Sequence, residues 1–127
     1  NTETSLMYSF VGVDGYSKFG SYTGNGNVIG PFIFTGFRPA CIILKNLGAG
    51  EAWYIFDDQR LGYNANRTYL VPSTNAVETT GSFQARDNDF LSNGFKIRTS
   101  NGAMNSSSVS YIYAAFAHAP FKTANAR

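Results

Sequence analysis

Apolar residues in this chain alternate with polar ones or gather in short runs, and no window repeats them at helical spacing beyond two turns. The strongest run covers Ala40 to Leu44, follows Pro39 directly and ends at Lys45-Asn46. A short apolar run bounded in this way predicts a strand buried on both faces. Because proline has no N–H to give to a ladder, we expect Pro39 at the first position of that strand.

Other segments also have the alternation or the aromatic and β-branched content of strands. They cover residues 6–11, 16–22, 31–35, 52–57, 68–71, 95–99 and 109–116. Asn93-Gly94 predicts a hairpin turn, because both residues tolerate the positive φ that such turns need. Residues 58–67 and 101–108 predict polar loops, and 74–84 predicts an edge strand or a surface excursion.

The two best core strands, 40–44 and 109–116, lie far apart in the sequence, so the chain must fold by non-local pairing. About ten strands within residues 1–127 are typical of one sandwich domain. We therefore expect an all-β fold, a single-domain antiparallel β-sandwich that is jelly-roll-like. A closed barrel is the alternative, and the sequence does not separate the two well.

Charge is scarce in this chain and is not concentrated anywhere. Charged residues make up 14% of the sequence and the net charge is +2, without a basic cluster. Polar surface must come from Asn, Ser, Thr and Gly, as in many secreted and virion proteins. We expect no nucleic-acid partner, because the electrostatic footprint is missing. We also expect no membrane insertion, because no segment is long enough to span a bilayer.

The sequence offers little for catalysis or metal binding. It holds one histidine, His118, and one cysteine, Cys41, whereas a zinc site needs three or four such ligands. We expect His118 to face outward from the last strand and Cys41 to be a buried, inert thiol. No serine-nucleophile motif is present. We predict no metal, no cofactor and no enzymatic activity.

Carboxylates leave one enzymatic alternative open. Two local acidic pairs occur, Asp57-Asp58 and Asp87 with Asp89. A glycosidase needs two carboxyl groups that face each other across a cleft. Glycan cleavage therefore requires a member of the first pair to face a member of the second.

Binding is the stronger candidate, because aromatic residues make up 16% of the chain. The segment 53–66 combines flat rings with carboxylate, amide and guanidinium groups, which a sugar surface requires. Its candidate ligand-binding residues are Trp53, Tyr54, Asp57, Asp58, Arg60, Tyr63 and Asn64. Loops on a rigid scaffold commonly carry binding. The alternative is that Trp53 and Ile55 pack inside while the loop only connects.

Four blocks in this order carry a family resemblance. They read DGYSKFGSYTGNG at 14–26, TGFRPA at 35–40, DFLSNGFK at 89–96, and YIYAAFA at 111–117 followed by APFK at 119–122. The chain resembles a domain of uncharacterised function in tail-fibre and other virion proteins of tailed phages, which often follows a concanavalin/laminin-G-like sandwich. Where members usually have an acidic residue, this chain has His118, which indicates a tolerant surface position. The resemblance transfers no catalytic residue.

A weaker internal similarity concerns the two ends of the chain. Residues 7–11 followed by 14–18 loosely match 113–117 followed by 120–122. This similarity favours a module of a longer chain or a strand-sharing array. The alternative is that two apolar strands are alike by chance.

The resemblance implies a component displayed on the virion surface. We expect adhesion to a host-surface glycan through weak contacts that a homo-oligomer, with a trimer favoured, multiplies. The alternative is a structural assembly subunit, either capsid-decorating or filament-forming, that contacts other virion proteins and has no ligand. Trp53 and Tyr63 discriminate the two: exposure in a groove favours adhesion, and burial in a subunit interface favours assembly.

Overall fold

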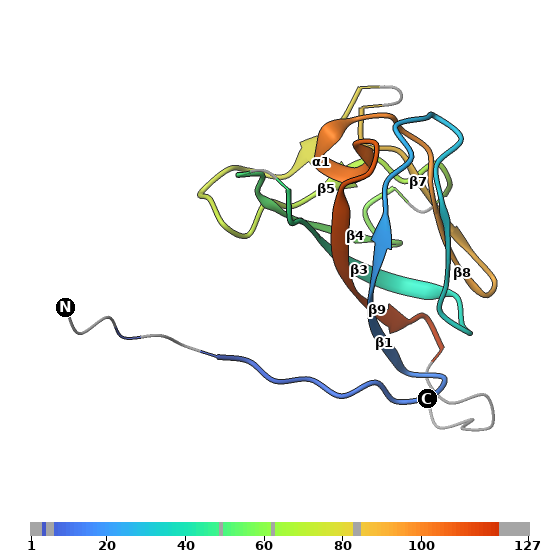
Figure 1. The fold of residues 1–127 in the computed structure, drawn as a ribbon. Coiled ribbons are helices and arrows are strands. Elements are labelled where there is room, and N and C mark those ends of the chain that lie inside the picture. Colours follow the sequence, from blue (N-terminus) through green and yellow to red (C-terminus); the bar gives the residue numbers. More distant parts are fainter. Residues whose placement is uncertain (1–3, 5–6, 49, 62, 83–84, 120–127) are drawn as a thin grey trace.

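The computed structural model describes residues 4, 7–48, 50–61, 63–82 and 85–119, and in these the chain forms nine strands and one short helix (Figure 1). The strands are β1 (Ser17–Thr23), β2 (Phe32–Phe34), β3 (Pro39–Asn46), β4 (Trp53–Asp57), β5 (Thr68–Tyr69), β6 (Thr79–Thr80), β7 (Asn88–Leu91), β8 (Gly94–Ile97) and β9 (Ser110–Ala117). The helix is α1 (Gly102–Asn105).

The strands build an antiparallel sandwich, which confirms the predicted fold class with nine strands in place of about ten. A four-stranded sheet, β1-β9-β3-β4, packs on a three-stranded sheet, β2-β8-β7. Phe95 of β8 meets Tyr22 of β1 and Tyr113 of β9 edge-on, with ring centroids 6.5 and 5.4 Å apart. The small sheet β5-β6 joins β4 through a bridge between Ile55 and Leu70.

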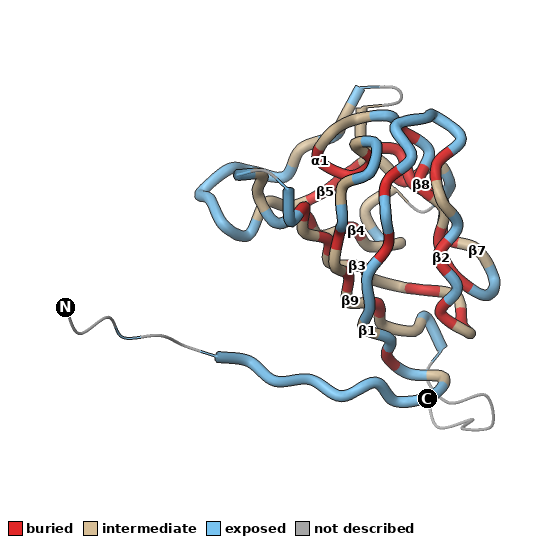
Figure 2. The backbone as a smooth tube through the Cα atoms, viewed as in Figure 1, coloured by how far each residue is buried: buried red, intermediate tan, exposed pale blue. Residues whose placement is uncertain are grey.

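The last strand, β9, lies between β1 and β3 and pairs with both along their lengths. Its inward residues form a core with those of the other strands (Figure 2). The fully buried large side chains of this core include Ile42, Leu44, Phe56, Phe95, Ile97, Met104 and Tyr111. The two core strands identified in the sequence, β3 and β9, thus pair with each other, as the non-local pattern predicted.

Strand β3 begins at Pro39 as predicted, but the prediction that both its faces are buried was wrong. Ile42 and Leu44 are fully buried, whereas Cys41 and Ile43 on the opposite face are only half-buried. The physical reason is that the second sheet covers one face of the four-stranded sheet. Among the described residues no second layer of strands lies on the other face.

Two further segments differ from the sequence prediction, and a third agrees with it. Residues 7–11, predicted as a strand, form an exposed arm without regular pairing, and Leu6 lies outside the described residues. Residues 101–108, predicted as a polar loop, contain α1, which Asn101 caps by accepting a hydrogen bond from Ala103 N. The fully buried side chain of Met104 anchors this helix in the core. In 74–84 the predicted edge strand is β6, and residues 83–84 lie outside the described part.

The predicted hairpin exists, but its turn lies one residue earlier than the sequence indicated. Leu91 pairs with Gly94, so Ser92-Asn93 form the turn and Gly94 is the first residue of β8. Neither Asn93 nor Gly94 has a positive φ. Gly94 instead permits a close approach, because a Cβ there would lie 2.1 Å from the Ile33 carbonyl oxygen of β2.

We expect Gly94→Ala to lower the free energy of unfolding by about 1–3 kcal/mol, the usual cost of overpacking. The added methyl group would force β2 away from β8 at a backbone contact. Thermal unfolding measures the effect. Gly50→Ala is the matched control, because nothing lies within 4 Å of a Cβ at that position. Equal melting temperatures for the two variants would contradict the steric role of Gly94.

Candidate functional site

The candidate residues on β4 point to opposite sides of the sheet, because successive side chains of a strand alternate. Trp53 faces outward and is 40% exposed, whereas Tyr54 faces the core and is 4% exposed. Asp57 faces outward at the far end of the same strand. The sequence-predicted contact surface is therefore divided between two ends and two faces of β4.

Tyr54 is an interior residue and offers no ring to a ligand. Its ring meets Tyr69 edge-on, and the Arg86 guanidinium lies 4.8 Å from its centroid. The Tyr54 hydroxyl accepts a hydrogen bond from Arg86 at 3.2 Å and lies 3.3 Å from a Glu51 carboxylate oxygen. Tyr54 thus joins β4 to the small sheet and to the segment that precedes β7.

Asp57 and Arg60 close the loop that follows β4. The Asp57 carboxylate accepts hydrogen bonds from the backbone N–H groups of Gln59 and Arg60 at 3.0 and 3.1 Å, the pattern of an Asx turn. It also accepts one from Arg60 Nε at 2.7 Å. Arg60 pairs with Glu78 as well, which connects the loop to the segment before β6. Both side chains are used within the fold.

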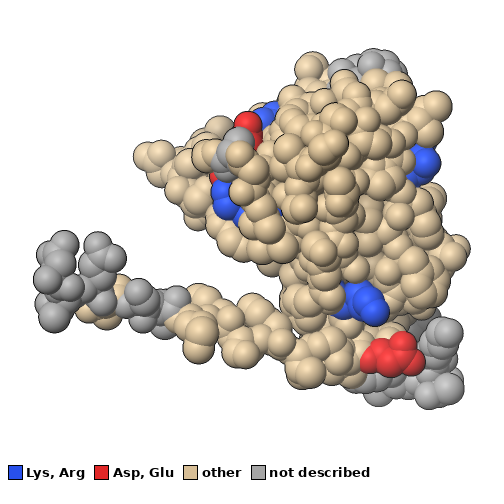
Figure 3. All heavy atoms as spheres, in the orientation of Figure 1, with Lys and Arg blue, Asp and Glu red and all other residues tan. Residues whose placement is uncertain are grey.

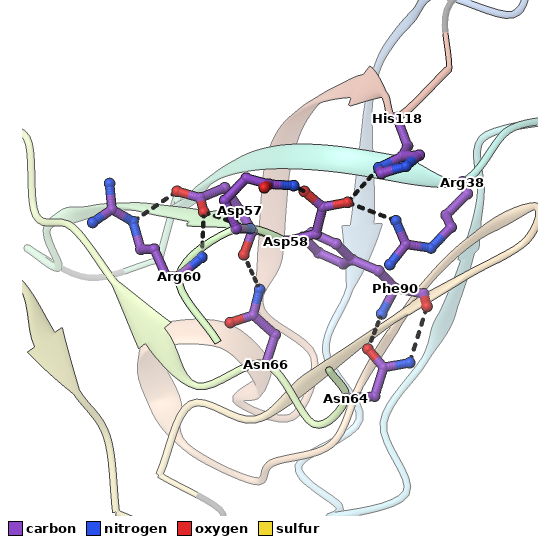
Figure 4. Close-up of polar contacts among 9 residues, drawn as sticks. Arg38, Asp57, Asp58, Arg60, Asn64, Asn66, Phe90 and His118 are labelled. Atoms are coloured by element: carbon purple, nitrogen blue, oxygen red, sulfur yellow. Dashed lines mark hydrogen bonds and ion pairs between the residues drawn. The ribbon is translucent and has the colours of Figure 1, made fainter. Parts of the chain in front are cut away.

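Asp58 is the centre of a polar cluster at the end of the four-stranded sheet (Figure 4). Its carboxylate accepts hydrogen bonds from Arg38 at 2.7 Å and from the Gln59 amide at 2.7 Å, and lies 2.5 Å from His118 Nδ1. The Asp58 side chain is only 6% exposed. Burial alone would raise its pKa, but the hydrogen bonds from Arg38, Gln59 and His118 outweigh burial and lower it.

Strand topology brings this cluster together. Arg38 precedes β3, Asp58 follows β4 and His118 follows β9, and these three strands are neighbours in the sheet. Asp58 N donates to the Ala40 carbonyl, and His118 N donates to the Arg38 carbonyl. Sequence reasoning missed Arg38 and placed His118 as an outward-facing strand residue. His118 is exposed, but it lies one residue past β9 and contacts Asp58.

A small polar hollow adjoins this cluster, with a volume of about 10 Å³, enough for one water molecule. Its lining residues are Arg38, Asp58, Tyr63, Asn64, Asn66 and Phe90. Tyr63 is 69% exposed at this hollow. The Asn64 side chain accepts from Phe90 N at 2.9 Å and donates to Phe90 O at 3.0 Å, so it continues the edge of β7. The loop that contains Tyr63 and Asn64 is therefore attached to β7 by hydrogen bonds, besides connecting β4 to β5.

Trp53 lies elsewhere, on an apolar groove of about 750 Å³ along the outer face of the four-stranded sheet. The groove is lined by Tyr8, Phe10, Phe19, Gly20, Ser21, Ile43, Trp53, Ile112, Tyr113 and Ala114. Few polar groups accompany the rings. Trp53 and Tyr63 thus occupy two different surfaces.

The four aspartates of the two acidic pairs each face a separate arginine. The pairs are Asp57–Arg60, Asp58–Arg38, Asp87–Arg67 and Asp89–Arg98. A general acid needs a raised pKa, which is opposite to the shift at Asp58. Burial, with the nearby Asp57 carboxylate, raises the pKa of the half-buried Cys41 thiol to about 11. Within the described ranges, no group of three His, Cys, Asp or Glu side chains could hold a metal ion.

Asp58 should make stability depend on pH. Its folded pKa lies below the ordinary value of 3.8. The unfolded chain therefore binds more protons in this window, and the stabilisation is present above about pH 4 and lost as pH falls through the folded pKa. We expect Asp58→Asn to cost about 1–2 kcal/mol at pH 7 and progressively less towards pH 2.5.

Urea unfolding of both proteins across this pH range measures the difference. Asp14→Asn serves as the control, because it removes one exposed carboxylate. A pH-independent cost of Asp58→Asn would contradict the role given to this carboxylate.

Comparison with known protein families shows which family this chain matches. A family model described as a domain of unknown function, DUF7483, matches residues 1–120. Comparison with curated proteins gives no match, and neither does comparison with solved structures. In the described part of the chain, no helix has the length and apolar character that crossing a membrane requires. With nearly its whole length matched, the chain belongs to this family of domains of unknown function.

Proposed function

We propose that this chain is a non-enzymatic structural module of a phage virion, of the tail-fibre kind, and that it adheres to the host surface. The four sequence blocks that resemble virion proteins support the location. The observation that carries adhesion is the exposed ring of Tyr63 at a hollow lined by Arg38, Asp58 and Asn64. The module is displayed on the outside of the particle.

This arrangement suits a glycan because its polar groups are already fixed. Asp58 is held by three side chains, and Asn64 is held by the Phe90 backbone. Arg38 gives one of its five N–H donors to Asp58, and its side chain is 39% exposed. A ligand therefore meets ordered donors and acceptors beside a flat aromatic ring, without first having to order them.

The hollow is too small to enclose a sugar, so a glycan would lie across its rim and against the Tyr63 ring. Few contacts give a weak single site. Display of several copies raises the overall affinity without new contacts, and it is the mechanism that we propose for adhesion.

A second candidate function is structural assembly without a ligand. Trp53 is exposed in a groove, as expected for adhesion, but the apolar lining of that groove favours assembly. A sugar groove needs hydrogen-bonding groups beside its rings, whereas Ile43 and Ile112 accompany Trp53. Such a groove fits protein side chains better than a glycan.

The adhesion proposal is tested on an array of lipopolysaccharide and capsular oligosaccharides. Biotinylated protein is presented on streptavidin, so that valency does not depend on self-association. We expect binding to some of these glycans, and a loss of about tenfold for Tyr63→Ala, which corresponds to about 1.4 kcal/mol.

Phe34→Ala is the matched control, because it removes a ring that is 62% exposed on β2 of the other sheet. Binding to no glycan, or equal losses for the two variants, would reject adhesion through Tyr63.

A further inference from the structure

We propose that the outer face of the four-stranded sheet is covered by the arm formed by residues 7–11 of a second copy of this chain. The arm of each copy would lie on the face of the other. This proposal does not depend on glycan binding at Tyr63, and it names the partner of the surface that contains Trp53.

The outer face is mostly apolar, with Ser17 and Ser21 of β1 among its uncharged polar residues. The strand registers place Phe19, Cys41, Ile43, Trp53, Ile55, Ile112, Ala114 and Phe116 on this side. Its two charged residues are engaged locally: the Lys45 ammonium donates to the Glu51 carbonyl, and Asp57 pairs with Arg60. Monomeric soluble proteins seldom leave an apolar patch of this extent uncovered.

The arm is equally apolar and has the right chemistry to cover such a face. Met7, Tyr8, Phe10 and Val11 are 86%, 74%, 65% and 76% exposed. Residues 7–13 include no charged side chain. The arm leaves the domain as an extended segment, and its described part shows neither basic nor acidic atoms (Figures 1 and 3).

One contact already shows that the arm and the face fit each other. The Phe10 ring stacks on Phe19 of β1, with centroids 5.4 Å apart and planes 20° apart. Tyr8 and Phe10 line the groove of about 750 Å³ together with Trp53. The arm thus forms one wall of the groove and does not fill it.

A second copy would cover both exposed surfaces, because its arm would lie in the groove of the first copy and its groove would receive the first copy's arm. Contacts of this kind are self-complementary, as a two-fold interface requires. At about 200 Å² for each aromatic side chain, Tyr8 and Phe10 of one arm together offer about 400 Å², before Met7 and Val11 are counted. Two arms and the two faces that they cover bury about 1,600 Å², the size of a standard stable interface.

The test compares the wild-type protein with the double variant Met7→Asp/Val11→Asp by light scattering at several concentrations. These two side chains are the most exposed of the arm, so the variant should fold normally. We expect a reversible increase in mass for the wild type and a shift to at least about tenfold higher concentration for the variant. Val77→Asp is the control, because Val77 is 82% exposed and lies outside the arm and the face.

A second measurement identifies where the arm binds. Protein that carries a spin label at Met7→Cys, with Cys41→Ala to leave a single thiol, is mixed with ¹⁵N-labelled protein without a spin label. Any broadening is then between copies, and we expect it at Ser21, Ile43 and Ile112. A wild type that stays monomeric, an equal effect of Val77→Asp, or no broadening at these residues would overturn the proposal. None of these readouts involves a glycan, so failure here is distinct from failure of adhesion.

Discussion

The position of β9 between β1 and β3 is the constraint on which the other features of this structure depend. A central strand alternates between two faces, and in β9 both sets of side chains are apolar. Tyr111 and Tyr113 close the core, while Ile112 and Phe116 lie on the outer face. The same strand ends where His118 meets Asp58. The core, the apolar outer face and the polar cluster therefore all require that the last strand be inserted between earlier ones.

Asparagine side chains make many of the hydrogen bonds that strand ladders and ion pairs provide in other domains. Asn64 pairs with both backbone groups of Phe90, and Asn66 donates to the Asp57 carbonyl. Asn105, which is fully buried, donates to two backbone carbonyls in neighbouring segments. Buried backbone groups need partners, and long connections cannot supply all of them from strands. This explains how a chain with 14% charged residues orders its loops.

Sequence patterns correctly predicted features that depend on the chemistry of a residue itself. They did not predict features that depend on contacts with a neighbouring strand. The start of β3 at Pro39 follows from the missing N–H of proline, and the spacing of the predicted strands indicated the sandwich class. Gly94 is needed because the Ile33 carbonyl of β2 approaches it closely. His118 contacts Asp58, which follows β4, and Arg38, which precedes β3. Residues 7–11 alternate like a strand, yet alternation cannot tell whether a partner strand is present in the same chain.

The separation of the two surfaces bears on how the proposed functions combine. Trp53 begins β4 and Asp57 ends it, which places them about 13 Å apart along the strand. Asp58 and the hollow at Tyr63 lie beyond that end. An arm laid over the Trp53 groove would therefore leave the hollow accessible, so self-association and host contact do not compete for the same surface. Association through the outer face would then supply two copies of Tyr63 in one assembly, and weak adhesion gains from this because the first contact raises the effective concentration of the second.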